Sequence, residues 1–312
     1  MLKKFIKLSK SDNIIKLGWN SIVYVINKYV FFKKSMVKNI HGYKMRLSLT
    51  DPGISRALAI VGTREKETKY ILEKAIHKDA DVIDVGANIG YYVLMERNLT
   101  NGMIYAFEPD IKNFADLNEN ILLNKADKIH CYHAAVSNKR GTATMHLSKL
   151  SNVHTLLPDD VLNQMSGETV KVKTIKLSKH IKEVLKKPID LIRMDIEGYE
   201  VEVLEDVVEM VSKQIVKPAV LFEIHSQKYN EEHSLTKQLM RLMKLGYRYK
   251  YMASTHIDKF TERGYKPEAK LLTDGTVRYI FKDVNNSDAL ELVDYCRAVL
   301  IKWLKQEYAG KI

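Results

Sequence analysis

A short apolar run that breaks into a glycine-punctuated turn places the strongest constraint on the fold of this chain. Residues 82–85 (Val-Ile-Asp-Val) have the length and apolar content of a buried strand, and Gly86, Asn88 and Gly90 separate them from a helix-capable segment at 91–99. Glycines at such a junction let a ligand approach the backbone closely, and the beginning of the helix offers it unpaired N–H groups. The stretch therefore predicts an α/β protein with a ligand site at a strand–helix turn.

An acidic residue follows at the position where α/β folds hold the ribose of a nucleotide. The expected second strand, 103–107, ends at Glu108, about 20 residues past the glycine turn. The turn lacks the third glycine of a dinucleotide motif, and Asp84 stands just before it. A carboxylate there repels a pyrophosphate but attracts an ammonium or sulfonium group. The pattern favours S-adenosylmethionine as the cofactor over a nicotinamide dinucleotide. The competing interpretation is a sharp turn in which Asp84 only caps the helix.

Further motifs resemble those of the FkbM-type family of class I S-adenosylmethionine-dependent methyltransferases. Besides the turn and Glu108, the resemblance rests on three segments, 134–137, 192–200 and 221–225. It covers about residues 50–230, and its most specific block is Asp195-Ile-Glu-Gly-Tyr-Glu200. The resemblance implies a seven-stranded sheet and methyl transfer to hydroxyl groups, often of sugars or polyketide-like natural products.

Strands and helices are expected to alternate along most of the chain. Seven segments have the pattern of strands: 82–85, 103–107, 129–133, 189–194, 218–225, 247–252 and 277–281. Residues 141–180 interrupt this order with two half-exposed strands, which predict an insertion near the site. A C-terminal helix is expected to carry an apolar face formed by Leu290, Val293, Cys296, Leu300 and Trp303. We expect an α/β, doubly wound, mostly parallel, seven-stranded Rossmann-like sheet with an N-terminal helical arm and a C-terminal helix.

The distribution of charge divides the chain into two parts. Of the net charge of +12, residues 1–46 carry +10, which leaves +2 for the other 266 residues. We therefore expect a basic helical arm at 1–46 and a nearly neutral methyltransferase domain at 47–312. The two cysteines, Cys131 and Cys296, are far apart and lack CxxC spacing, so they favour a reducing compartment, here the cytoplasm.

The basic arm also carries an apolar stripe. Its apolar residues recur at helical spacing at Ile15, Trp19, Ile22, Val23, Ile26 and Val30. The apolar stretch 17–32 is too short and too polar for a confident membrane-spanning helix, and no convincing cleavage site for a signal peptide follows it. Two interpretations stay open. The helix either packs on the domain with solvated lysines, or lies with residues 1–38 on an anionic membrane surface.

Three polar residues fall where the carboxyl ends of parallel strands should converge: Asp195, Glu197 and His225. An unperturbed histidine is mostly neutral at pH 7, so His225 is the expected general base. Asp195 and Glu197 would orient acceptor hydroxyls or, with His225, hold a divalent cation. The alternatives are that Glu197 only caps a helix and that His225 only bonds a backbone carbonyl. Glu223 is expected to point away from the site.

The cofactor site is expected to include Asp84, Gly86, Asn88, Gly90, Glu108 and, beside the adenine ring, Ala135. We expect an S-adenosylmethionine-dependent O-methyltransferase that acts on a sugar, glycan or natural product. A first alternative is an RNA methyltransferase, because the basic arm would bind phosphates. Nucleic acid is nevertheless an unexpected partner, since the nearly neutral body shows no basic stripe with interleaved aromatic residues. A second alternative is a non-catalytic or membrane-recruited protein that binds S-adenosylmethionine.

Overall fold

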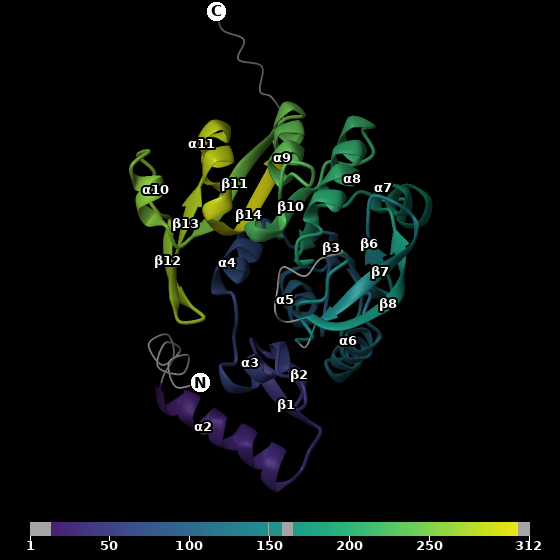
Figure 1. Ribbon diagram of the computed structural model, residues 1–312, viewed down its shortest axis with the longest axis vertical. Coiled ribbons are helices and arrows are strands. Elements are labelled where there is room, and N and C mark those ends of the chain that lie inside the picture. The colour runs from purple at the N-terminus through teal and green to yellow at the C-terminus, as the bar shows by residue number, and fades with distance from the viewer. Residues whose placement is uncertain (1–13, 149, 158–164, 305–312) are drawn as a thin grey trace, which may run out of the picture.

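The computed structural model describes residues 14–148, 150–157 and 165–304, and a nine-stranded sheet lies at its centre (Figure 1). The order across the sheet is β12-β13-β11-β14-β10-β9-β3-β4-β5. These strands are β3 Val82–Val85, β4 Ile104–Phe107, β5 Ile129–Tyr132, β9 Leu191–Met194, β10 Ala219–Glu223, β11 Tyr247–Ser254, β12 Ala269–Thr273, β13 Thr276–Lys282 and β14 Cys296–Trp303. From β5 to β10 all pairs are parallel, and from β10 to β12 all pairs are antiparallel.

The predicted C-terminal helix is wrong. Helix α11 (Asn286–Leu292) ends early, and Cys296–Trp303 form strand β14 between β10 and β11. Residues 298–301 of this strand are buried on both faces, so their apolar run has no alternation and periodicity alone does not distinguish it from a buried helix. The expected strand at 277–281 lies within β13. With β12 it forms a hairpin that extends a core of seven strands to nine.

Helices cover both faces of the sheet, which confirms the doubly wound architecture. One core includes residues of α3 (Ile54–Ile60), α4 (Lys66–Ala75), α5 (Tyr91–Leu99) and α6 (Ile111–Leu123). The other includes residues of α7 (Leu177–His180), α8 (Glu200–Ser212), α9 (Leu235–Lys244), α10 (Ile257–Thr261) and α11. The expected apolar stripe of α8 is buried, and its members are Val201, Leu204, Val208 and Val211. Burial of such stripes supplies most of the stability of these helices.

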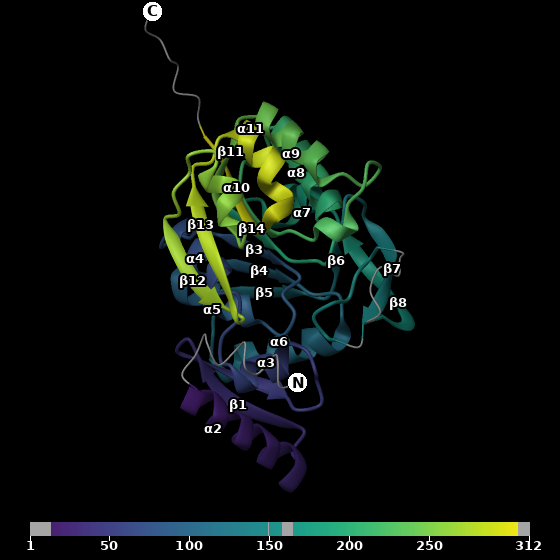
Figure 2. The same cartoon turned by 60° about the vertical axis from the view of Figure 1, so that its left-hand side comes forward.

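The predicted insertion forms a separate small sheet. Strands β6 (Ala135–Val136), β7 (Gly141–Ser148) and β8 (Met165–Ile175) pair in the order β6-β8-β7. Figures 1 and 2 show this sheet to one side of the central sheet. It therefore adds to the architecture without extending the central sheet.

The N-terminal part begins with helix α2 (Ile14–Val25) and a π-helical segment at Ile26–Val30, followed by a hairpin of β1 (Ser35–Ile40) and β2 (Tyr43–Ser48). Helix α2 packs on α3 and buries Leu17 and Tyr24. The hairpin crosses the boundary expected at residue 46 and shares its core with α3, α4 and α5. No helix among the described residues is long and apolar enough to cross a membrane.

Candidate active site

The turn after β3 comes into direct contact with the turn after β9. Gly86 has a φ of +80°, and a Cβ added there would lie 2.3 Å from the carbonyl oxygen of Asp195. Gly90 has a φ of +88°, and its Cβ would lie 2.8 Å from Leu117. Only glycine satisfies both the backbone conformation and the space at these positions. The two glycines therefore hold an open backbone loop at the beginning of α5.

Glu108 faces this loop from the end of β4. The N–H of Asn88 donates to its Oε2 at 2.8 Å, and the N–H of Asp110 donates to its Oε1 at 2.8 Å. Burial raises the pKa of Glu108 to about 7, although these backbone donors oppose the shift. Each oxygen keeps further acceptor capacity, since a carboxylate oxygen has two lone pairs. The carboxylate is therefore fixed in place and able to accept hydrogen bonds from a ligand.

A cavity beside Glu108 contains most of the residues predicted to bind the donor. Gly86, Asn88, Glu108 and Ala135 line it, while Gly90 stands behind them as the N-cap of α5. The cavity is also lined by Ser151, Asn152, His154, Thr155 and Leu156. The carbonyl oxygen of Ser151 accepts from the side-chain amides of Asn88 at 3.0 Å and Asn113 at 2.8 Å. These two bonds connect the backbone at Ser151 to the loop after β3 and to helix α6.

The structure does not bring Asp84 into this cavity. The side chain of Asp84 is completely buried, and its Oδ1 accepts from Arg193 Nη1 at 3.0 Å. Arg193 in turn lies over the ring of Tyr92, 4.0 Å from the ring centroid. Asp84 and Arg193 face each other from the neighbouring strands β3 and β9. An internal ion pair therefore separates the Asp84 carboxylate from the place where a cationic ligand would bind.

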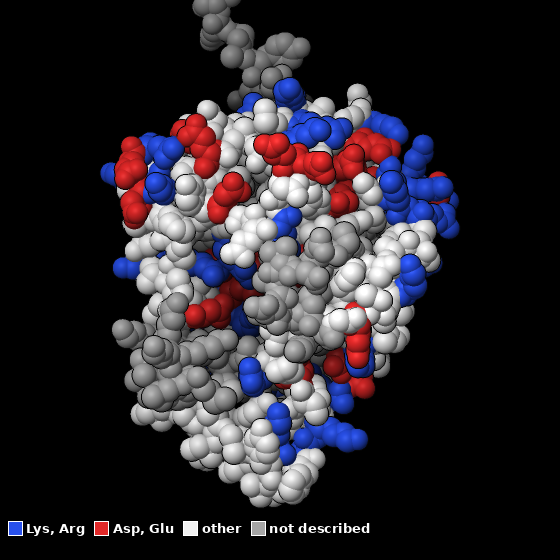
Figure 3. Space-filling view, in the orientation of Figure 1, with Lys and Arg blue, Asp and Glu red and all other residues white. Residues whose placement is uncertain are grey.

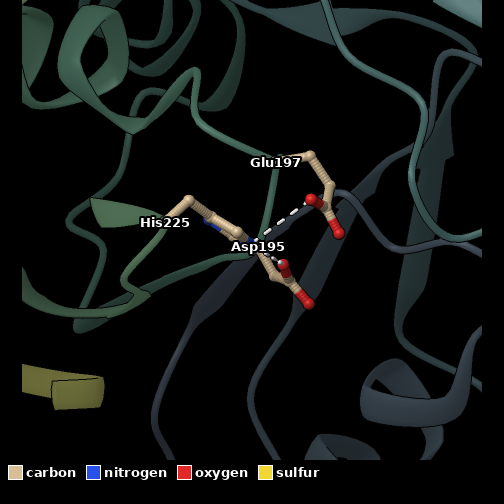
Figure 4. A group of neighbouring side chains, drawn as sticks. All are labelled: Asp195, Glu197 and His225. Carbon is tan, nitrogen blue, oxygen red and sulfur yellow. Dashed lines mark ion pairs between the residues drawn. The ribbon is translucent and has the colours of Figure 1, made fainter. Parts of the chain in front are cut away.

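Asp195, Glu197 and His225 converge as predicted (Figure 4). Asp195 and Glu197 follow β9, and His225 follows the adjacent parallel strand β10. The Nε2 atom of His225 lies 3.8 Å from Asp195 Oδ1 and 3.5 Å from Glu197 Oε2. Glu197 adopts a φ of +55°, which turns the chain sharply at this point. The carboxyl ends of the two strands thus place an imidazole and two carboxylates within one small volume.

Glu200 holds the other side of the imidazole, and the hydroxyl of Tyr229 donates to its Oε2 at 2.9 Å. Burial alone would lower the pKa of His225, but the carboxylates of Glu200 and Glu223 outweigh it and raise the pKa well above 6.5. In this geometry the imidazole carries a proton near neutral pH. The expectation that His225 has an ordinary pKa is therefore wrong.

The sequence also failed to identify Glu223. Its Oε1 lies 3.4 Å from His225 Nε2, and the carboxylate pairs with Arg297. Alternation along a strand places residues 223 and 225 on the same face, so the expectation that Glu223 points away from the site is wrong. Strand β10 ends at Glu223, and His225 has left strand geometry with φ −115° and ψ 60°. Burial raises the pKa of Glu223 to about 8, and Asp195 contributes to the same shift.

A second cavity joins the loop after β3 to this polar cluster. Its lining combines Gly86 and Asn88 with Asp195 and Glu197, and adds Arg64, Glu65, Arg193 and Arg297. Burial alone would raise the pKa of Glu65, but Arg64 and Arg297 bring it to about 2. Arg64, Glu65 and Arg297 are distant in the sequence from both the loop and the cluster, so spacing gave no signal for them. The loop after β3, which would hold a methyl donor, therefore lines the same cavity as Asp195 and Glu197, which would accept a proton.

The same cluster has the donor atoms of a cation site. One ligand atom each from Asp195, Glu197 and His225 lie within 4.8 Å of one another. His225 Nε2 is buried and has no hydrogen-bond partner among the described residues. Two carboxylates and an imidazole suit divalent cations such as Mn²⁺ or Zn²⁺, and Glu200 would orient the imidazole through its contact with Nδ1.

A family model for the methyltransferase FkbM domain matches residues 84–251, which is more than half of the chain. A curated relative, methyltransferase sdnD from Sordaria araneosa, is 31% identical, with 41% of this chain and 60% of the relative covered. The chain therefore spans less than two thirds of the length of this relative. The matched range contains the turn after β3, Glu108, and all three members of the polar cluster.

Solved structures with a similar arrangement include an rRNA methylase from Streptococcus thermophilus, 8% identical with a TM-score of 0.40, covering 77% of this chain and 95% of that one. TYW2 from M. jannaschii, in complex with AdoMet, is 13% identical with a TM-score of 0.39, covering 87% and 88%. Trm5b from Pyrococcus abyssi is 12% identical with a TM-score of 0.41, covering 86% and 56%. These likenesses are too distant to bear on what the chain acts on.

Proposed function

The chain belongs to the FkbM methyltransferase family, and on this premise we propose that it transfers a methyl group from S-adenosylmethionine to a hydroxyl group of a sugar, glycan or natural product. One observation carries the proposal. Gly86 and Asn88 of the donor loop line the same cavity as Asp195 and Glu197. A methyl donor on the loop would therefore face groups that can accept the proton of a hydroxyl acceptor.

The donor is proposed to bind in the cavity beside Glu108. Glu108 would accept hydrogen bonds from the ribose hydroxyls, the turn from Gly86 to Gly90 would lie against the amino-acid part, and Ala135 would leave room for the adenine ring. Asp84 would not contact the donor itself. Its ion pair with Arg193 would hold β3, which precedes the loop, against β9, which precedes Asp195 and Glu197.

The proposed reaction is a direct in-line displacement. The acceptor oxygen forms a bond to the methyl carbon, the carbon–sulfur bond breaks, and its electron pair stays on sulfur to give S-adenosylhomocysteine. The hydroxyl proton passes to the cluster of Asp195, Glu197 and His225, which shares protons as a unit because its members lie within 4 Å. Glu200 and Tyr229 are positioning residues that hold the imidazole in place.

The alternative occupant of this cluster is a divalent cation, which would bind in place of the proton. His225 Nε2 is a buried ligand atom without a hydrogen-bond partner in the described structure, and both carboxylates point toward it (Figure 4). A bound cation would act as a Lewis acid that lowers the pKa of an acceptor hydroxyl. Asp195, Glu197 and His225 would supply its protein ligands.

Calorimetry of the full-length protein tests the central assignment. We expect saturable binding of S-adenosylhomocysteine and none of NAD. No uptake of S-adenosylhomocysteine, or preference for NAD, would refute the proposal. Donor turnover with hydroxyl-bearing glycans should then exceed turnover with RNA. Methylation of RNA by the pure protein would favour the alternative raised by the basic arm, and binding without turnover on any acceptor would favour a non-catalytic role.

A peripheral membrane location is proposed for the N-terminal part. Half of the large apolar side chains that are exposed in the described structure fall within residues 15–32, and they include Ile15 at 82%, Trp19 at 65% and Phe32 at 81% exposure. Residues 13–50 contain basic side chains and no acidic one. In Figure 3 the end of the molecule formed by α2 is mainly uncharged at its surface. This combination fits a helix that lies on an anionic bilayer and brings a lipid-linked acceptor near the site.

A further inference from the structure

A second histidine, His154, lines the cavity beside Glu108 and has no role in the proposed reaction. It lies between β7 and β8, on a segment that hydrogen bonds hold on both sides of it. Before it, the carbonyl oxygen of Ser151 accepts from the side-chain amide of Asn113 at 2.8 Å. After it, the hydroxyl of Thr155 donates to the carbonyl oxygen of residue 197 at 2.9 Å. The backbone therefore fixes the position from which the imidazole reaches the cavity.

The contacts of the imidazole define its tautomer. The backbone N–H of Ser148 donates to His154 Nδ1 at 2.9 Å, so Nδ1 is an acceptor and carries no proton. Burial lowers the pKa of His154 below its ordinary value, and the opposing charges of Asp110 and Asp51 do not reverse the shift. A neutral imidazole with an unprotonated Nδ1 carries its proton on Nε2. His154 therefore presents an N–H donor at Nε2.

This donor has no acceptor within hydrogen-bond distance among the described residues. The carboxylate oxygen Oδ2 of Asp110 is 4.0 Å from His154 Nε2, which is too far for a hydrogen bond. The other oxygen of Asp110 caps helix α6 by accepting from the N–H groups of Lys112 and Asn113. The N–H of Asp110 donates to Glu108 Oε1 at 2.8 Å. Asp110 thus connects the histidine to the carboxylate that is proposed to bind the ribose.

We propose that His154 donates a hydrogen bond from Nε2 to a ribose hydroxyl oxygen of S-adenosylmethionine. The inference rests on the proposed function and adds a binding residue to its donor site. A hydroxyl group both donates and accepts hydrogen bonds, whereas an ionised Glu108 can only accept them. Glu108 would therefore take the hydroxyl protons and leave the oxygen lone pairs without a donor. The N–H of His154 supplies that donor.

The chemistry of the lining favours the ribose over the adenine ring as the partner of His154. Ala135, Met145 and Leu156 line the cavity and belong to one apolar cluster, which suits the flat face of adenine. His154 lies beside Asp110 instead, and Asp110 contacts Glu108 directly. The N–H at Nε2 therefore belongs to the polar part of the lining, where the ribose hydroxyls are proposed to bind.

Calorimetric titration of the full-length protein with S-adenosylhomocysteine tests this contact in two matched variants. The amide of His154→Asn can keep the acceptor for the Ser148 N–H but has no donor at the position of Nε2. The longer side chain of His154→Gln returns an N–H donor to that position. We expect His154→Asn to bind at least about fivefold more weakly, as for the loss of one hydrogen bond, and His154→Gln to stay within about twofold of the unmodified protein.

The 2′-deoxy and 3′-deoxy analogues of S-adenosylhomocysteine identify the ligand atom. Removal of the contacted hydroxyl should weaken binding to the unmodified protein at least about threefold more than it weakens binding to His154→Asn. A loss of order in the segment would instead weaken all three ligands equally. The control is His146→Asn, because His146 lies on β7 of the same small sheet and does not line the cavity. It should bind all three ligands as the unmodified protein does.

The outcomes separate this inference from the proposed function. Normal uptake of S-adenosylhomocysteine by the unmodified protein, with equal affinity in His154→Asn, would overturn the inference and leave the methyltransferase assignment intact. Weakened binding with the same preference over both deoxy analogues would also overturn it. Weak binding by His154→Gln with normal binding by His154→Asn would reduce His154 to a support for Ser148. No uptake by the unmodified protein would refute the inference and the proposed function together.

Discussion

Glu200 Oε1 lies 3.1 Å from Nδ1 of His225, so the imidazole is held from the side opposite to Asp195 and Glu197. Because Glu200 is completely buried and also accepts from the Tyr229 hydroxyl, the ring has little freedom to rotate. Its Nε2 atom is thereby directed at the carboxylates of Asp195 and Glu197, which line one cavity with Gly86 and Asn88. The expected effects of substituting Glu200 or His225 follow from this arrangement.

Replacing His225 by alanine should reduce kcat by about 100-fold or more, the usual contribution of a positioned proton-transfer group. Affinity for S-adenosylhomocysteine should stay within about twofold, because His225 does not line the donor cavity. Turnover assays measure kcat, and calorimetry measures the affinity for S-adenosylhomocysteine. His77→Ala is the matched control, since His77 is exposed and remote in the sequence from the cluster. Unchanged kcat in His225→Ala would remove this residue from the mechanism.

Donor affinity should depend on pH through Glu108. Its pKa is raised to about 7, so the side chain is ionised above that value and protonated below it. An ionised carboxylate accepts hydrogen bonds from both ribose hydroxyls, whereas the protonated form has lost acceptor capacity. Binding of S-adenosylhomocysteine should therefore tighten as pH rises from 6 to 8. Glu108→Gln should bind about tenfold more weakly at pH 8 and lose the pH dependence, and a slope that persists in this variant would contradict the assignment.

Gly86→Ala should destabilise the fold by about 2–4 kcal/mol, since its Cβ would overlap the carbonyl oxygen of Asp195 in addition to the strain of a positive φ. Gly264→Ala separates the two causes. Gly264 has a φ of +84° and open space around the added Cβ, so it should lose only about 1 kcal/mol. Denaturant unfolding measures both variants. Equal losses would show that the contact with Asp195 contributes nothing.

The double variant Trp19→Ser/Phe32→Ser should bind vesicles with anionic lipids at least about tenfold more weakly than the unmodified protein, because two exposed apolar side chains would no longer enter the bilayer. Leu122→Ser is a control for apolar surface elsewhere, since Leu122 is 75% exposed on α6. Co-sedimentation at low and moderate salt provides the measurement. If the double variant sediments like the unmodified protein, α2 is not the membrane contact.

Mn²⁺ should bind the full-length protein at one site without donor or acceptor present, and Glu197→Gln should weaken this binding by about tenfold or more through loss of a charged ligand. Glu183→Gln provides the control, because Glu183 is exposed and pairs only with Lys179 among the described residues. Calorimetry after treatment with a chelator measures the affinity. Equal binding by the Glu197 and Glu183 variants would place the cation elsewhere.

The pattern of residues predicted the parallel half of the sheet well. Short runs such as 82–85 and 191–194 are mainly apolar, are buried on both faces and are bounded by turn signals, so their strand character is local. The same property misassigned β14, because residues 298–301 follow α11 closely and continue an apolar spacing that also suits a helix. Only the packing of this segment between β10 and β11 decides its conformation.

The site was predictable where it follows strand ends and unpredictable where it depends on tertiary pairing. Asp195, Glu197 and His225 could be inferred because parallel strands bring their carboxyl ends together. The inward position of Glu223 accompanies its ion pair with Arg297, and the burial of Asp84 accompanies its ion pair with Arg193, from a strand more than 100 residues away. Helix α2 packs on the domain through Leu17 and Tyr24, as one interpretation of the arm expects, and its other face is exposed. The membrane interpretation stays a proposal.

The approach of Gly86 to the Asp195 carbonyl has an evolutionary consequence. At Gly86 no side chain separates the turn after β3 from the main chain of Asp195, so the spacing between these two turns is a property of the main chain. Relatives that acquire new acceptors cannot adjust this spacing by substitution at either turn. We expect their divergence to concentrate in the peripheral additions, namely the small sheet, the β12–β13 hairpin and α2, while the turns themselves vary little.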